Sequence, residues 1–356
     1  MEELQHQTNA AEDDPLVEDR NMRSSVSSYE EVDSDEGTLR VKKPKSNELQ
    51  ASFNLFKTFI GIGILALPKS FMYTGLGLSL VVMILIGYLN YHTMLLTVEI
   101  ADRKPREKIT YQSMAREILG DWAYKSVMYS IFFIQTGCGI SGLIFAHQFL
   151  RSTFCIYEVK ELCENPGYNA LFFALVIIPL TFINNLHYFY IPSLFSTIFL
   201  LVGLSAQTYY NFDLLAAKDI GWNLFFDKLG EFNLLHLPLL FGVAIYAYEG
   251  VGILFEIRAS MEKPGRFGRL LSWIMISLVV IYTVFPSISY LAFGEDTPDI
   301  ILLSLPKSSS YLIVKSLYAL SVVLVYPLQM APSFKIIEEI DFLKERLYSQ
   351  NGKDIN

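Results

Sequence analysis

The chain has 356 residues, of which 52% are hydrophobic, 14% aromatic and 18% charged, and its formal net charge is -8. This composition is too apolar for an ordinary soluble protein and predicts an integral membrane protein. The acidic balance and the lack of a basic patch argue against nucleic-acid binding.

The first part of the chain differs from the rest in composition. Residues 1–46 are polar, rich in Asp, Glu and Ser, and almost free of aromatic residues. Such a segment cannot bury enough apolar surface to fold alone. We predict a disordered acidic cytosolic tail over 1–46, in which the run EEVDSDE and a serine cluster could also serve as a phosphorylation or partner site.

About eight apolar segments follow, each near 20 residues long and able to cross the hydrocarbon core of a bilayer. They lack the polar stripe at helical period that a core helix of a soluble protein carries. Their approximate limits are 49–73, 76–98, 127–150, 168–184, 190–210, 237–257, 270–293 and 311–336. We predict a transmembrane domain over 47–339 and a short cytosolic tail over 340–356.

Basic residues alternate between the predicted loops. Lys and Arg cluster before the first span, between the second and third, between the sixth and seventh, and after the eighth. Cytoplasmic loops are enriched in these residues, so both termini are predicted to be cytosolic. No retention or lipidation signal stands out, which leaves a vacuolar or lysosomal membrane and the plasma membrane both open.

The first span contains potential helix breakers. It includes FNLFKTFIGIGILALPKSF, in which Gly61 and Gly63 lie in the middle and Pro68 follows. A broken helix is tolerated at membrane depth only where the freed backbone groups are buried in protein or line a polar cavity, as in transporter binding sites. Small residues in membrane helices also serve close packing, and this alternative stays open for GIG taken alone.

The sixth span contains a second interruption, LPLLFGVAIYAYEGVGILFEI, with Glu249 beside Gly250 and Gly252. An ionisable residue at bilayer depth is costly and indicates a functional site. In folds built from inverted repeats, substrate and coupling ion bind near the midplane between two discontinuous helices. Two interruptions, in the first and the sixth span, therefore favour a binding site over packing alone.

The three cysteines predict at most one disulfide. Cys155 and Cys163 share a non-cytosolic loop, where oxidising conditions could join them, while Cys138 lies within the third span. Neither the cysteines nor the five histidines have the spacing of a metal site, so no metal and no cofactor is expected. No catalytic pair such as HExxH is present, so an enzyme is not expected either.

Three segments resemble the amino acid/auxin permease family. FNLFKTFIGIGILALPKSF is similar to its first transmembrane helix, with the pattern G-x-G-ϕ-L-x-L-P, and AIYAYEGVGILFEIRASMEKP to its sixth. SYLAFGEDTPDIILLSLP resembles the end of the seventh helix and the following loop. The resemblance covers about 47–339 and implies an all-α membrane protein with a LeuT-like inverted-repeat bundle, broken first and sixth helices, and secondary active transport of amino acids driven by H⁺ or Na⁺.

The resemblance also implies roles for individual residues. The substrate site would be formed by Gly61, Ile62, Gly63 and Ile64 at its carboxylate and by Tyr246, Tyr248 and Glu249 on the opposite wall. Glu249 would bind the amino group, titrate with the driving proton, or hold the broken helix in shape. The coupling ion would involve Asn54, Glu249 and Ser321. Asn54 stands where the animal proton-coupled branch tends to have His, and Asn cannot carry a proton.

The family usually has about ten or eleven spans, and a LeuT-like core needs about ten, so the resemblance implies that the last helices are missing. The predicted function is transport of amino acids, small neutral ones foremost, by alternating access. The alternative is a non-transporting nutrient sensor or an inactive truncated partner of a full-length permease. The expected partners are accordingly an amino acid, the lipid bilayer and, in the alternative, that permease.

Overall fold

The computed structural model describes residues 47–103, 110–157, 159, 163–181, 190–218, 222–250, 254–306 and 308–339. Both predicted tails, 1–46 and 340–356, lie outside these residues. The described residues form helices and no strand, which confirms the all-α prediction. The α-helices are α2 (Glu48–Phe59), α3 (Leu67–Thr74), α4 (Leu76–Asp102), α5 (Tyr111–Leu119), α6 (Asp121–Ile156), α8 (Pro166–Thr181), α9 (Tyr190–Ala217), α10 (Trp222–Leu229), α11 (Leu237–Ala247), α12 (Leu254–Ser260), α13 (Phe267–Phe293) and α14 (Ser309–Glu339). The short 3-10 helices are η1 (Ile62–Leu65), η3 (Leu234–His236), η5 (Pro264–Arg266), η6 (Gly294–Asp296) and η7 (Ile301–Ser304).

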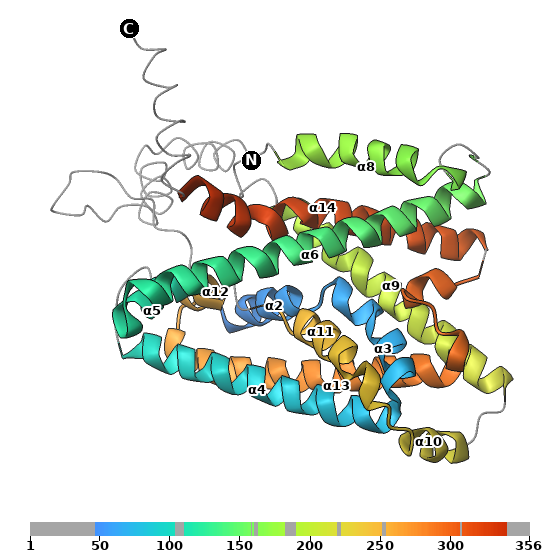
Figure 1. The fold of residues 1–356 in the computed structure, drawn as a ribbon, viewed down its shortest axis with the longest axis horizontal. Coiled ribbons are helices and arrows are strands. Elements are labelled where there is room, and N and C mark those ends of the chain that lie inside the picture. The colour runs from blue at the N-terminus through green and yellow to red at the C-terminus, as the bar shows by residue number, and fades with distance from the viewer. Residues whose placement is uncertain are drawn as a thin grey trace, which may run out of the picture.

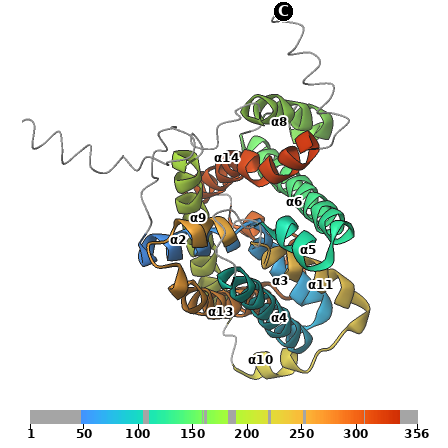
Figure 2. The ribbon, with the colours of Figure 1, turned by 90° about the vertical axis from the view of Figure 1, so that its left-hand side faces the viewer.

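The long helices form two groups with the short helices between them. α4 packs against α13 on one side, and α6 packs against α14 on the other (Figure 1). The view along the bundle shows α2, α3 and α11 between these pairs (Figure 2). α9 contacts both α13 and α14 and so connects the two groups. α2, α3 and α11 therefore lie between the two groups of long helices (Figure 2).

Each predicted apolar span contains helix among its described residues. Three helical stretches within the described residues are long and apolar enough to cross a membrane, namely Leu76–Asp102, Asp121–Cys155 and Pro264–Asp296. Leu234–Ala247 and Ser309–Leu324 are shorter apolar helical segments. The first and sixth predicted spans are each divided into shorter helices. Each of these helices is too short to be identified as a membrane span by its length alone.

The outer surface of α13 is apolar. Trp273, Ile276 and Val280 are 66%, 57% and 54% exposed. In water, exposing such large apolar side chains costs free energy, and soluble proteins usually bury them. Hydrocarbon around the helix removes this cost, because lipid chains are as apolar as the side chains. The exposed surface is therefore suited to contact with a lipid bilayer.

The first predicted span is interrupted at GIG. α2 ends at Phe59, Ile60 and Gly61 have extended backbone, and η1 leads into α3. Pro68 lies in the first turn of α3, where its missing N–H has no helical partner to lose. The structure therefore places two short helices end to end with an irregular stretch between them.

The second predicted interruption is also present. α11 ends at Ala247, and Tyr248, Glu249 and Gly250 are not helical, before α12 begins at Leu254. Residues 251–253, with Gly252 among them, lie outside the described residues. The relation of the two halves by an inverted repeat stays a prediction.

The connection between α3 and α4 is held by the segment that precedes α11. Gly75 has a φ of +84°, and a Cβ at this position would collide with the carbonyl oxygen of Glu231, so both the backbone and the space require glycine. The Asn233 N–H donates to the Thr74 carbonyl at 2.9 Å. This contact fixes the start of α11 beside the end of α3.

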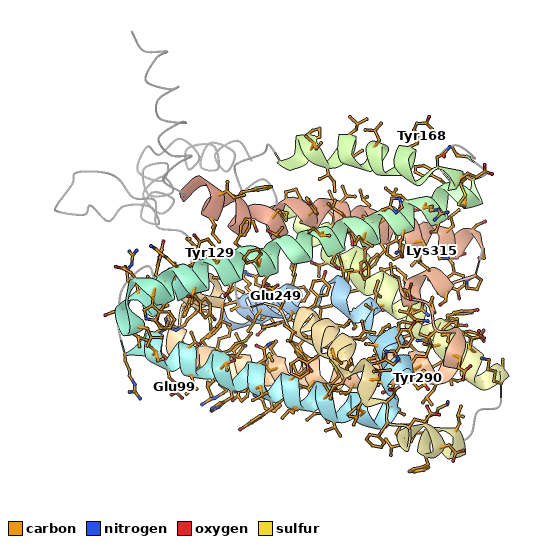
Figure 3. All side chains as sticks on the ribbon, in the orientation of Figure 1. Glu99, Tyr129, Tyr168, Glu249, Tyr290 and Lys315 are labelled. Carbon is orange, nitrogen blue, oxygen red and sulfur yellow. A yellow bond between two sulfur atoms is a disulfide. The ribbon has the colours of Figure 1, made fainter. Side chains whose placement is uncertain are left out.

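Three lysines donate to main-chain carbonyls of one segment, residues 292–305. Lys69 Nζ donates to Thr297 O at 2.8 Å, and Lys218 Nζ donates to Ala292 O at 2.7 Å. Lys315 Nζ, on α14 (Figure 3), donates to Leu303 O at 3.1 Å and to Leu305 O at 2.8 Å. Because the three lysines come from or directly follow α3, α9 and α14, they fix this segment, which begins at the end of α13, to these three helices.

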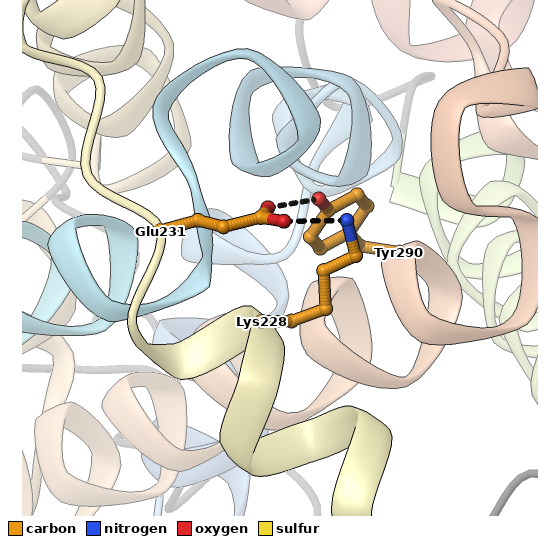
Figure 4. A network of polar contacts seen from close by, with 3 residues as sticks. All are labelled: Lys228, Glu231 and Tyr290. Atoms are coloured by element: carbon orange, nitrogen blue, oxygen red, sulfur yellow. Dashed lines mark hydrogen bonds and ion pairs between the residues drawn. The ribbon is translucent and has the colours of Figure 1, made fainter.

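A polar network joins α10 to the end of α13. Glu231 accepts from Lys228 Nζ at 2.6 Å and from the Tyr290 hydroxyl at 2.9 Å (Figure 4). The hydrogen bond to Glu231 is the main reason that the pKa of Lys228 lies above its ordinary value. The protonated form of this lysine is therefore the form that stabilises the fold.

We expect Lys228→Met to lower the free energy of unfolding by up to about 1 kcal/mol, the range of exposed ion pairs. A lysine with a raised folded-state pKa contributes its full stabilisation below its unfolded pKa, about 10.4, and loses it as pH rises through the folded-state pKa. Thermal unfolding in detergent should therefore separate the variant from the wild type at neutral pH, and the difference should shrink in strongly alkaline buffer. Equal melting temperatures at neutral pH would contradict the prediction.

Cys155 and Cys163 are joined by a disulfide at the end of α6 that leads toward α8. Cys138 is free and buried in the middle of α6. The rate at which a thiol reagent modifies Cys138 can therefore be used to measure access to the interior of the bundle.

Candidate functional site

Glu249 lies in the middle of the molecule, between α6 and the interrupted helices (Figure 3). It lies two residues after the end of α11, and its Oε1 accepts from Gln135 Nε2 of α6 at 3.0 Å. The Gln135 side chain is itself buried. A carboxylate inside a membrane protein is costly unless it is hydrogen-bonded, and Gln135 supplies such a bond.

Further polar side chains gather around this pair. Cys138 follows Gln135 by one helical turn and lies close to the Gln329 amide of α14. Tyr246 of α11 lies close to Ser141 of α6 and to Gln329. We call the following set the polar cluster: Gln135, Cys138, Ser141, Tyr246, Glu249 and Gln329. It joins α6, α11 and α14 at the point where α11 stops.

The first interruption lies against the second. A Cβ on Gly63 would lie 2.9 Å from Ala247 Cα and 3.2 Å from Tyr246 Cδ1, so no other residue fits without displacing the backbone of α11. A Cβ on Gly250 would collide with the ring of Phe59. Gly63 and Gly250 therefore allow a backbone approach that any side chain would prevent.

Ile62, within the stretch from Gly61 to Ile64, faces α6. A Cβ built on Gly142 would lie 3.9 Å from Ile62 Cδ1 and from Gln329 Oε1, so η1 and α14 meet at this position of α6. No atom within 4 Å would meet a Cβ on Gly61, which leaves open space beside it. Gly63 is thus brought against Tyr246, and Ile62 lies beside Gln329 of the polar cluster.

Three other predicted site residues are not brought into the polar cluster. Tyr248 is fully buried, and its hydroxyl donates to Met83 O at 3.2 Å on α4, away from α6. Asn54 is exposed on α2. Ser321 is buried, and its carbonyl accepts from Ser196 Oγ at 3.0 Å where α14 meets α9. The helical phase explains the placement of Tyr248, because neighbouring residues at the end of a helix point in different directions.

Sequence reasoning did not identify Gln135 and Ser141. The available signal is their spacing within the third predicted span: Gln135, Cys138 and Gly142 occur at i, i+3 and i+7 and share one face of a helix. Small and polar residues on one face of an apolar helix indicate that this face contacts protein. The partner of that face cannot be read from the spacing.

A bundle of membrane-type helices in which two interrupted helices meet at a buried carboxylate defines a class of membrane transport proteins. The sequence matches the family described as "Transmembrane amino acid transporter protein" over residues 44–355, and the chain belongs to this family. The family consists of transporters and not of enzymes. The expected family membership is therefore confirmed.

Relatives with similar sequences occur in fungi and plants. Vacuolar amino acid transporter 4 of Saccharomyces cerevisiae is 28% identical over 300 residues, which cover 82% of this chain and 40% of that protein. Vacuolar amino acid transporter 3 of Schizosaccharomyces pombe is 25% identical over 361 residues, covering 99% and 52%. Amino acid transporter ANT1 of Arabidopsis thaliana is 25% identical over 315 residues, covering 85% and 70%. The chain spans about half the length of the fungal relatives it matches.

Proposed function

We propose that this chain carries amino acids across a membrane by secondary active transport, with small neutral amino acids as its substrates. The observation that carries the proposal is the meeting of the two helix interruptions beside the Glu249–Gln135 pair. An amino acid offers one carboxylate and one ammonium group, and the two interruptions offer complementary groups. Family membership supports the same substrate class.

In this proposal the substrate carboxylate binds the main chain near Gly61, where space is open, and accepts from N–H groups of the stretch up to Ile64. The ammonium group binds Glu249, whose Oε1 already accepts from Gln135. A charge-assisted hydrogen bond to a carboxylate is about twice as strong as a neutral one. The side chain of the substrate points towards Ser141 and Gly142, whose small size favours small neutral amino acids.

Glu249 is also the residue that we propose for coupling to the driving ion, H⁺ or Na⁺. Either ion neutralises a carboxylate whose negative charge is costly inside the bilayer. Asn54 cannot take up a proton, and it is exposed. The vacuolar names of the fungal relatives support a vacuolar or lysosomal membrane, with the N terminus in the cytosol as the basic loops predict.

The test is uptake of labelled small neutral amino acids by vesicles that contain the purified chain, with an imposed H⁺ or Na⁺ gradient. We expect uptake that requires one of the two gradients and that is absent from empty vesicles. Retained amino-acid binding without uptake under either gradient would reject transport and favour the sensor alternative. The absence of both binding and uptake would reject both functions.

Cys138 provides a second test that does not depend on uptake. It is the free cysteine of the chain, since Cys155 and Cys163 form a disulfide, and it lies in the polar cluster. A bound amino acid should therefore shield it, and at about ten times the Kd the rate of modification by a small thiol reagent should fall about tenfold. Cys138→Ser is the control that should remove the labelling. Equal rates with and without a transported amino acid would contradict the placement of the substrate.

A further inference from the structure

The end of α2 leaves a main-chain carbonyl that the helix itself cannot satisfy. The last residue of α2 is Phe59, and the chain beyond it is extended, so the Phe59 carbonyl has no helical N–H to accept from. The Tyr282 hydroxyl of α13 donates to this carbonyl at 2.6 Å. Tyr282 is fully buried, so this bond is made away from solvent.

The end of α11 is stabilised in the same way by α4. The Tyr248 carbonyl, directly after α11, accepts from Asn90 Nδ2 at 3.0 Å. The hydroxyl of the same tyrosine donates to Met83 O at 3.2 Å. A Cβ on Gly87 would lie 2.8 Å from this hydroxyl, so glycine leaves the room that the ring occupies on α4. α4 thus holds Tyr248 by its main chain and by its side chain.

The two arrangements are in contact with each other. The rings of Tyr248 and Tyr282 have centroids 5.1 Å apart and planes inclined at 64°, the edge-to-face geometry that aromatic rings prefer. The contacts therefore run without a gap from the Phe59 carbonyl through Tyr282 and Tyr248 to the end of α11. One aromatic pair therefore contacts both interruptions.

We propose that Tyr248 and Tyr282 are positioning residues, which hold the two helix interruptions in the relative position that binds substrate. The inference rests on the proposed function. It assigns to Tyr248 a role behind the site instead of the substrate contact that the sequence implied.

The close packing of the interruptions is the reason that this position matters. Gly63 lies against Ala247, and Gly250 lies against Phe59, each without room for a methyl group. A shift of the Phe59 carbonyl therefore moves η1 relative to Glu249. Displacements of about 1 Å in a binding constellation are enough to weaken it strongly.

Tyr282→Phe removes only the hydroxyl that the Phe59 carbonyl accepts from. We expect the KM for uptake to rise about tenfold, which corresponds to about 1.4 kcal/mol and lies within the cost of leaving one buried polar group without a partner. The maximal rate per folded molecule should change by less than about twofold. The double variant with Tyr248→Phe should raise KM by less than the product of the two single effects, because both residues act through one contact.

Tyr290→Phe is the matched control. It removes a hydroxyl from the same helix, but one that donates to Glu231 and not to an interrupted helix. We expect it to lower the melting temperature and leave KM as in the wild type. Equal changes of KM in the Tyr282 and Tyr290 variants would overturn the proposal, because they would show a general effect of destabilising α13.

The rate at which Cys138 reacts without amino acid gives a readout that needs no transport. Tyr282→Phe should increase this rate at least about threefold, because loosened interruptions expose the polar cluster more often, and Tyr290→Phe should not. A wild-type rate together with a wild-type KM in Tyr282→Phe would overturn the inference. A chain that shows neither uptake nor substrate protection, but faster modification in Tyr282→Phe only, would reject the proposed function and retain the positioning pair.

Discussion

Gly63→Ala is expected to lower kcat/KM for uptake by about a hundredfold, equivalent to about 3 kcal/mol. A Cβ at this position would lie 2.9 Å from Ala247 Cα, an approach that real Cβ atoms do not make. The nearest atoms belong to the backbone, so no flexible side chain can move aside. Overpacking of this kind costs about 1–3 kcal/mol, and here the displaced backbone also belongs to the proposed substrate site.

Gly242→Ala is the control for this variant. Gly242 lies on α11 like Ala247, but no atom within 4 Å would meet its Cβ. Alanine also favours helix over glycine by about 1 kcal/mol, so the control should transport as the wild type does. Both variants are compared per folded molecule, by vesicle uptake and by detergent melting. Wild-type uptake in Gly63→Ala would show that the interruptions are not packed as described.

Glu249→Gln should lower kcat/KM by at least about a hundredfold and remove the dependence of uptake on the driving ion. The amide has the shape of the carboxylate and can still accept from Gln135 Nε2, so the polar cluster stays hydrogen-bonded. It lacks the negative charge that, in the proposed mechanism, binds the substrate ammonium group and the driving ion. Hydrogen bonds to charged groups contribute about 1.5–3 kcal/mol each, which matches the expected loss.

The measurement is uptake over a range of pH and of Na⁺ concentration, with binding assayed by substrate protection of Cys138. Glu99→Gln is the control, because it makes the same change at an exposed position of α4 (Figure 3). Wild-type uptake with unaltered ion dependence in Glu249→Gln would remove Glu249 from the machinery. If Glu249→Gln loses both uptake and the protection of Cys138 by substrate, the substitution acts on substrate binding.

Much of this architecture follows from local sequence. The apolar spans are visible because each must match the bilayer thickness with few charged residues, and each contains helix among its described residues. Both interruptions were predictable too, since Gly61, Gly63 and Gly250 disfavour a continuous helix and the charge of Glu249 is costly at bilayer depth. The Cys155–Cys163 disulfide could be predicted as possible because the two cysteines are close in the sequence and share a predicted loop.

Tertiary structure decided which side chains surround the interruptions. The sequence places Tyr246, Tyr248 and Glu249 within four residues, yet Tyr248 points to α4 and Glu249 to α6. The direction of each side chain depends on where α11 stops and on which helix packs against each face. The direction of each side chain at a helix end is set by those long-range contacts and not by local helix propensity.

The partners from distant helices were likewise beyond the sequence. Gln135 lies 114 residues from Glu249, and Tyr282 lies 223 residues from the Phe59 carbonyl that it satisfies. The spacing of Gln135 marks a helix face that contacts protein, but nothing local names the partner of either side chain. The positions of the helices and of their two breaks can be read from local sequence, because the bilayer imposes strong rules on backbone hydrogen bonding. The packing of α4, α6, α13 and α14 decided what the breaks face, because that depends on contacts between segments far apart in the chain.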